Sequence, residues 1–123
     1  MVHISGMQGY DFLAKPPGLV AGGIANETHQ ALSNVAAVMK AARNATMDDI
    51  VECQVLLADI KEFDAFNKVY GTFFPGPVKP ARMASQGVLA GTGAVEIKCL
   101  GDVSQKAVPA APRASSPRLP TAT

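Results

Sequence analysis

Apolar residues recur along this chain with two different spacings, and these spacings predict helices and strands in turn. Across residues 26–43 they return every three or four positions, which places them on one face of a helix. Across residues 50–58 apolar and polar residues alternate, as is typical of a strand with one buried face. A second helix is expected to begin after Asp59, where Asp-Ile-Lys-Glu has the form of a capping box, and to end before Pro75.

Three further segments complete the expected domain. Residues 1–5 read as a short strand, and residues 7–23 as a connection in which glycine and proline leave little room for regular structure. Two last strands lie within residues 79–101 and are joined by a turn near residues 91–93. This order of elements predicts an α+β fold, with a mixed β-sheet and two helices packed on one face.

Two helices on one face leave the other face of the sheet bare. The last two strands contain or adjoin Met83, Val88, Val95 and Ile97, which two helices cannot all cover if the strands alternate. Since the folded part offers no other element to cover them, we expect the chain to associate with copies of itself.

The composition changes at residue 103. Residues 103–123 are dominated by proline, alanine, serine and threonine and show no periodicity, which predicts a disordered tail after a folded domain of residues 1–102. The chain as a whole has a formal net charge of +1, so nothing indicates nucleic acid or a membrane surface as a partner. No apolar run reaches the roughly 18 residues that span a bilayer.

The chain has two cysteines, Cys53 and Cys99, and both lie in apolar, strand-like runs. We interpret them as buried free thiols, with a disulfide as the alternative. Free thiols suit a reducing compartment, so we expect a cytoplasmic protein, or a mitochondrial one if a leader is missing from this chain. The cysteine and histidine spacing does not suggest a metal site.

Arg82 and Glu96 are unusual choices for the last two strands. Arg82 is either a surface residue in an ion pair or an anchor for a ligand carboxylate, which the planar guanidinium matches with two parallel hydrogen bonds. Glu96, between Val95 and Ile97, is either on the solvated face of its strand or a partly desolvated base for proton transfer.

The distance between these two residues limits what one chain can do. In a hairpin, Glu96 would pair with Gly87 or Val88, five or six residues from Arg82, so the two would be roughly 15–20 Å apart at ~3.3 Å per residue. One chain would not easily bring both to one ligand, whereas two neighbouring chains could.

Several of these segments together resemble the RidA family, also called YjgF. The segments "HISGMQG", "ETHQALSNVAAVMKAA", "VLLADIKEFDAFNKVYGTFF", "PAR" and "VEIKCLG" occur in its order and approximate spacing over about residues 2–101. The resemblance implies a chorismate-mutase-like fold and a homotrimer with ligand sites between neighbouring chains. It also implies hydrolysis of 2-iminobutanoate and 2-iminopropanoate to 2-oxo acids and ammonia, without metal or organic cofactor.

The resemblance also assigns roles to individual residues. Arg82 would hold the substrate carboxylate, and Glu96 would position or activate the attacking water. Ala84, where many relatives have cysteine, would face the ligand with its backbone. The other expected binding residues are Ser5 and Gly6 in the first loop and Asn67 in the second helix.

The start of the sequence departs from this family. Typical members have a further strand, and a pocket tyrosine in a "GPYSQ"-like motif, before the segment that here begins "MVHISG", so we expect an N-terminal strand to be missing. The alternative function is therefore a trimeric small-carboxylate-binding or regulatory module without deaminase activity. Ribonuclease activity, also described for the family, gains little support, because the chain is near-neutral and has no pair of histidines that would act as acid and base.

Overall fold

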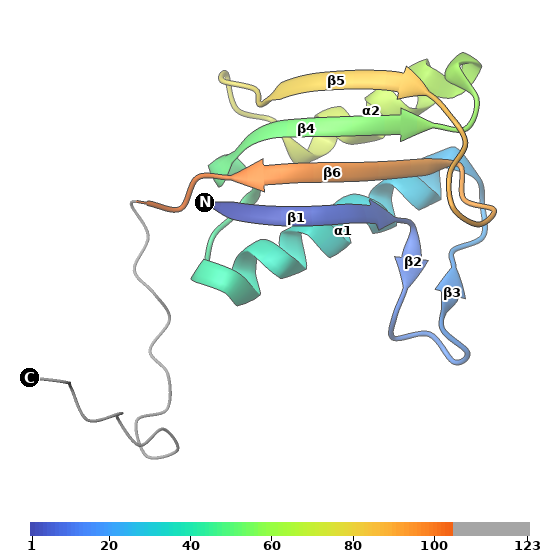
Figure 1. Cartoon of the computed structure of the whole chain (residues 1–123), viewed down its shortest axis with the longest axis horizontal. Helices are drawn as coiled ribbons and strands as arrows, with labels where there is room; N and C mark the ends of the chain where they lie inside the picture. Colours follow the sequence, from blue (N-terminus) through green and yellow to red (C-terminus); the bar gives the residue numbers. More distant parts are fainter. Residues whose placement is uncertain (105–123) are drawn as a thin grey trace, which may run out of the picture.

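The main sheet has four strands in the order β1-β6-β4-β5 (Figure 1). These strands span Val2–Gln8 (β1), Ile50–Leu57 (β4), Ala81–Gln86 (β5) and Val95–Gly101 (β6). The structure is a computed structural model that describes residues 1–104, so the predicted tail lies, but for its first two residues, outside the described part.

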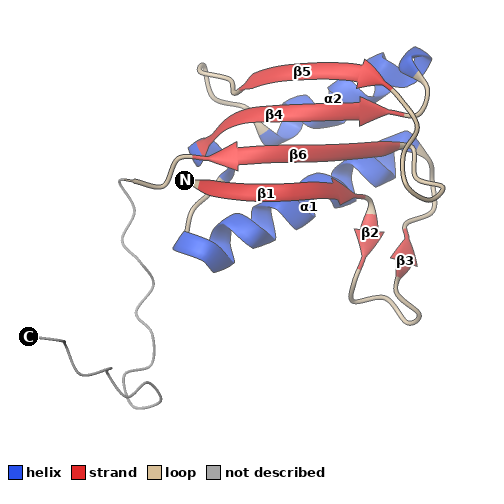
Figure 2. Cartoon of the chain, viewed as in Figure 1, coloured by secondary structure: helices blue, strands red, loops and turns tan. Residues whose placement is uncertain are grey.

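Two helices cover one face of this sheet, as Figure 2 shows. They are α1 (Ile24–Arg43) and α2 (Phe63–Phe73). The predicted α+β class, a mixed sheet with both helices on one face, is therefore confirmed. The Asp59 carboxylate accepts a hydrogen bond from the Lys61 N–H, but this cap begins a short 3-10 helix, Ile60–Glu62, and α2 follows directly. No helix in the described part of the chain is long and apolar enough to cross a membrane.

The alternating pattern of β4 and β6 fixes which face meets the helices. In both strands alternate residues are buried towards the helices, while Glu52, Gln54 and Lys98 between them are exposed on the other side. Helix α1 packs on this buried face with its apolar stripe, and α2 packs on it with Phe66 and Tyr70. The core also includes Val103, one residue beyond the predicted end of the domain.

The predicted hairpin between the last two strands is wrong. β5 pairs only with β4 and runs parallel to it, while β6 lies between β1 and β4 and is antiparallel to both. The physical reason is that β4, α2 and β5 form a β-α-β crossover, which returns the chain to the same direction beside β4. Glu96 therefore pairs with Leu56 and Gln8 rather than with Gly87 or Val88.

The N-terminal region holds more regular structure than its glycine and proline content predicts. β1 continues to Gln8, and the following connection forms a small hairpin of β2 (Tyr10–Asp11) and β3 (Gly18–Leu19). The Asn34 side chain of α1 donates hydrogen bonds to the backbone oxygens of Gln8 and Tyr10, which ties this hairpin to the helix.

The face of the sheet away from the helices, here called the open face, is not covered by any element of residues 1–104. Of the four apolar residues expected to need cover, Val95 and Ile97 are buried under the helices, but Met83 is 60% and Val88 99% exposed. The open face therefore carries exposed apolar surface, although less than the sequence predicts.

Candidate functional site

Arg82 lies at the edge of the molecule formed by β5 and α2. Its guanidinium carbon is 4.7 Å from the centre of the Tyr70 ring and 5.2 Å from that of Phe63. Its Nη1 donates a hydrogen bond to the Oδ1 of Asn67 at 2.5 Å. Aromatic rings and a side-chain amide thus orient the guanidinium without neutralising its charge.

No ion pair to Arg82 occurs among residues 1–104. This observation removes the simplest structural explanation of the residue, a surface salt bridge. The remaining donors of the guanidinium can take a carboxylate, because a ligand with two oxygens matches its planar fork.

A pocket of about 370 Å³ adjoins this guanidinium. Helix α2 lines one side, and the chain leading into β5 lines the other. The lining residues are Asn67, Tyr70, Gly71, Phe74, Lys79, Pro80 and Arg82. Lys79 is engaged at the end of α2, where its Nζ donates to the backbone oxygen of Phe74. The pocket therefore combines apolar walls with positive charge, which suits a small organic anion.

Ala84 lies two residues after Arg82 on the same strand. Its strand partner is Val55, which is buried, and Ala84 itself is half-buried against the core. The small side chain thus points to the helix side of the sheet, as that of Arg82 does, and leaves the backbone of the edge strand β5 open on its outer side.

Glu96 lies on the open face, half-buried beside β1. Its Oε1 accepts a hydrogen bond from the Nε2 of Gln8 at 3.1 Å, and the same nitrogen donates to the backbone oxygen of Ala90 at 2.8 Å. Gln8 therefore fixes the carboxylate relative to the loop before β6. The second oxygen, Oε2, is not used by this contact.

Gly6 allows the Glu96 carboxylate to lie directly over β1. A Cβ at this position would come within 2.7 Å of the Glu96 Oε2, closer than real contacts allow. Ser5 and Gly6 fall in an irregularity of the β1–β6 pairing between Ile4 and Met7, and Ser5 is exposed. Ser5, Gly6 and Glu96 thus form one group, and Arg82, Ala84 and Asn67 form another.

The two groups lie on opposite faces of one chain. Arg82 is the strand partner of Cys53 and Glu96 that of Leu56, and Cys53 and Leu56, three residues apart on β4, point in opposite directions. Two strand spacings and three residues along the strand separate their Cα atoms by about 14 Å. One chain therefore cannot bring Arg82 and Glu96 to one small ligand, although the reason is the position of β4 and not a hairpin.

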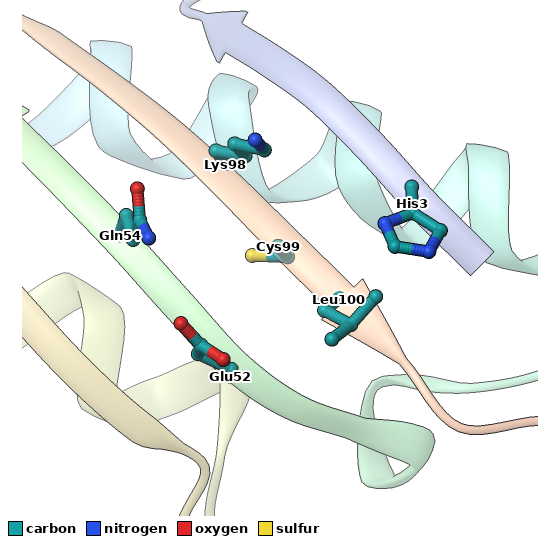
Figure 3. A pocket seen from close by; sticks show the side chains of 6 residues that line it. All are labelled: His3, Glu52, Gln54, Lys98, Cys99 and Leu100. Atoms are coloured by element: carbon teal, nitrogen blue, oxygen red, sulfur yellow. The ribbon is translucent and has the colours of Figure 1, made fainter. Parts of the chain in front are cut away.

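The open face also has a shallow hollow of about 120 Å³, shown in Figure 3. Side chains of β1, β4 and β6 surround it, among them His3, Glu52 and Lys98. The hollow is at the other end of β6 from Glu96, so it is separate from both groups described above.

Two residues important to this geometry were not predicted from the sequence. Tyr70 falls in the predicted second helix and Gln8 in the predicted connection of residues 7–23, and the sequence assigned no role to either. Neither has a sequence signal of its own: the roles depend on a ring facing Arg82 across two elements and on an amide facing Glu96 across two strands.

Comparison with known proteins identifies the family of the chain and shows the same fold in solved structures. A family model described as Endoribonuclease L-PSP matches residues 1–103, so the chain belongs to this family, which is the RidA/YjgF family. The chain is 41% identical over 85 residues to the 2-iminobutanoate/2-iminopropanoate deaminase of Rattus norvegicus, a match that covers 69% of this chain and 59% of that protein. It is 40% identical over 100 residues to the protein of the same name from Capra hircus, covering 80% and 70%.

Solved structures show the same fold. That of RidA from an Antarctic Psychrobacter has a TM-score of 0.71 and 31% identity, with coverage of 79% of this chain and 76% of that one. The yeast Mmf1 structure has a TM-score of 0.71 and 30% identity, with 80% and 76%. The chain spans about three fifths of the length of its rat and mouse relatives.

Proposed function

We propose that this protein hydrolyses small 2-imino acids, such as 2-iminobutanoate and 2-iminopropanoate, to 2-oxo acids and ammonia. The observation that carries the proposal is Arg82, an oriented guanidinium beside a pocket, with no ion pair in the described part of the chain. The names of the relatives at about 40% identity support the same chemistry.

Arg82 would bind the carboxylate of the substrate with two charge-assisted hydrogen bonds. Asn67 and Tyr70 hold the guanidinium in place before the ligand arrives, so little side-chain freedom is lost on binding. The apolar walls of the pocket suit a short alkyl side chain, and Ala84, two residues after Arg82 on β5, points to the same side of the sheet as Arg82.

Glu96 would activate the attacking water. The substrate reacts in its iminium form: as a general base Glu96 takes a proton from water while the oxygen adds to the iminium carbon, giving a neutral carbinolamine. Glu96 then returns this proton to the nitrogen and accepts the proton of the carbinolamine hydroxyl as the C=O bond forms and the C–N bond breaks, and ammonia and the 2-oxo acid leave. The hydrogen bond from Gln8 fixes one carboxylate oxygen and leaves the other for this proton transfer.

The site would be shared between neighbouring copies of a homotrimer. Arg82 and Glu96 lie on opposite faces of one chain, so a working pair requires Arg82 of one copy and Glu96 of the next. In a closed ring every copy contributes both groups once, which gives three equal sites. Met83 and the half-buried Leu56 and Leu100 are apolar residues of the open face that such an assembly would cover.

Ammonia release from 2-iminobutanoate generated in situ tests the proposal. We expect the wild type to accelerate the formation of ammonia and 2-oxobutanoate in equal amounts. Glu96→Gln removes the proton acceptor and should lower turnover strongly, whereas Asp64→Asn, an exposed acid on α2, should not. Binding of 2-oxobutanoate without any ammonia release would replace the deaminase by the binding-module alternative.

A further inference from the structure

Cys53 and Cys99 face each other across the two central strands of the sheet. They are directly paired residues of β4 and β6, and their sulfur atoms are 2.6 Å apart. Both are free thiols, and their side chains are only 0% and 2% exposed. In Figure 3 the sulfur of Cys99 lies on the β4 side of β6.

Packing alone does not require two sulfur atoms here. A single cysteine behaves as a small apolar residue in a core, but two cysteines that face each other can also form a disulfide. Opposite residues of antiparallel strands have Cα atoms about 4.5–5.5 Å apart, within the range that a disulfide spans. The pairing of Cys53 with Cys99 therefore places their Cα atoms at a separation that a disulfide can span.

The pair is also connected to the candidate site. Cys53 is the strand partner of Arg82, and the Tyr70 ring that supports Arg82 packs in the same core. The Tyr70 hydroxyl is buried and has no hydrogen-bond partner of suitable geometry among the described residues. The order Cys99, Cys53, Tyr70, Arg82 thus leads from the middle of the sheet to the pocket.

We propose that Cys53 and Cys99 are a redox modification site, which a peroxide converts to a cross-strand disulfide beneath Tyr70. The Cys53 thiolate attacks one peroxide oxygen, the O–O bond breaks, and a sulfenic acid and a first water form. The Cys99 thiol then attacks the Cys53 sulfur, the S–O bond breaks, and a second water leaves. The two thiols lose two electrons and two protons in total, and the peroxide is reduced to two waters.

The environment of the two thiols favours this order of events. The hydrogen bond with Cys99 lowers the pKa of the Cys53 thiol, and Tyr70 and the charge of Arg82 lower it further, against the effect of burial. The same hydrogen bond and burial raise the pKa of Cys99. Cys53, the strand partner of Arg82, is assigned as the attacking group because it lies nearer the positive charge, and Cys99 as the resolving one.

Three measurements on the full chain test the site. After treatment of the reduced protein with hydrogen peroxide, a non-reducing peptide map should contain a Cys53–Cys99 linked peptide that a thiol reductant removes. The disulfide closes a long loop, so the melting temperature of the oxidised wild type should rise by about 5 °C or more, and that of Cys53→Ala should not rise. In Cys99→Ala a sulfenic-acid probe should label Cys53.

Tyrosine emission provides a local readout. The chain has two tyrosines and no tryptophan, so Tyr10→Phe leaves Tyr70 as the only emitter. Its fluorescence should fall when the disulfide forms, because a disulfide quenches an adjacent phenol, and should recover on reduction. Cys53→Ala in the same background should show no change, which separates this effect from methionine oxidation.

The expected effect of the disulfide on ligand affinity rests on the proposed function, so it is measured separately. The Kd of 2-oxobutanoate should differ at least about threefold between the reduced and oxidised wild type, and not between the two treatments of Cys53→Ala. Two free thiols after peroxide treatment, or a disulfide between chains, would overturn the redox site whatever the activity. A linked peptide with unchanged tyrosine emission and ligand affinity would overturn its connection to the pocket.

Discussion

Replacement of Arg82 should weaken the use of substrate much more than it destabilises the fold. The side chain is exposed, and its contacts among residues 1–104 are a hydrogen bond to Asn67 and cation–π contacts with the rings of Tyr70, Phe63 and Phe66. An exposed cation–π contact contributes about 0.5–1 kcal/mol, so Arg82→Ala should lower the melting temperature by only a few degrees.

The loss of binding free energy for the substrate should be much larger than this loss of stability. Hydrogen bonds to charged groups contribute roughly 1.5–3 kcal/mol each, and a bidentate carboxylate uses two of them. Arg82→Ala should therefore lower kcat/KM for an imino acid by at least ~100-fold, since each 1.4 kcal/mol or so is a factor of ten. Arg82→Lys keeps the charge but loses the planar fork, so it should restore only a small part of this.

The assay couples in situ formation of 2-iminobutanoate to ammonia detection, with melting temperature and mass in solution measured on the same samples. Lys68→Ala removes an exposed charge from α2 outside the pocket lining and serves as the control. An unchanged rate together with loss of assembly would refute the reasoning, because Arg82 would then be an interface residue and not a carboxylate anchor.

Three other predictions follow from the geometry. Light scattering at micromolar concentration should give a homotrimer, and a monomer mass would contradict the shared site. Gly6→Ala should lower turnover, because the new Cβ would come within 2.7 Å of the Glu96 carboxylate, whereas Gly18→Ala, with open space around it, should not; equal rates would show that the position of Glu96 is unimportant. Removal of residues 105–123, which have the composition of the predicted tail, should change the melting temperature by less than about 2 °C; a larger loss would place part of the core in that segment.

Local pattern was enough to predict most of the elements of this fold. The alternation in β4 and the spacing of three and four in α1 each show that one face of the element is buried. Such a pattern involves only residues close together in the sequence, so it can be read without knowing the fold. The same reasoning placed the two helices on one face and predicted that they could not cover all of four apolar residues; Met83 and Val88 are exposed, whereas Val95 and Ile97 are buried. The family motifs then indicated Arg82, Glu96 and Asn67.

Strand order could not be predicted in the same way. Strands that are neighbours in sequence favour a hairpin. Here β5 follows a helix and pairs in parallel with β4, so β6 pairs with the opposite edge of β4 and with β1. The contact between Gln8 and Glu96 depends on this order, since it joins residues 88 positions apart. The support of Arg82 by Tyr70 likewise requires knowledge of which face of β5 meets α2.

The most direct test of a site shared between chains is to mix two inactive variants. Arg82→Ala and Glu96→Gln subunits, each inactive alone, are co-expressed in equal amounts with different tags, and ammonia release is measured on the purified mixed assemblies. If each site takes Arg82 from one copy and Glu96 from the next, every trimer that contains both variants has both groups intact in one of its three sites, so about a third of the wild-type rate should return. No recovery in assemblies shown to contain both subunits would contradict the shared site.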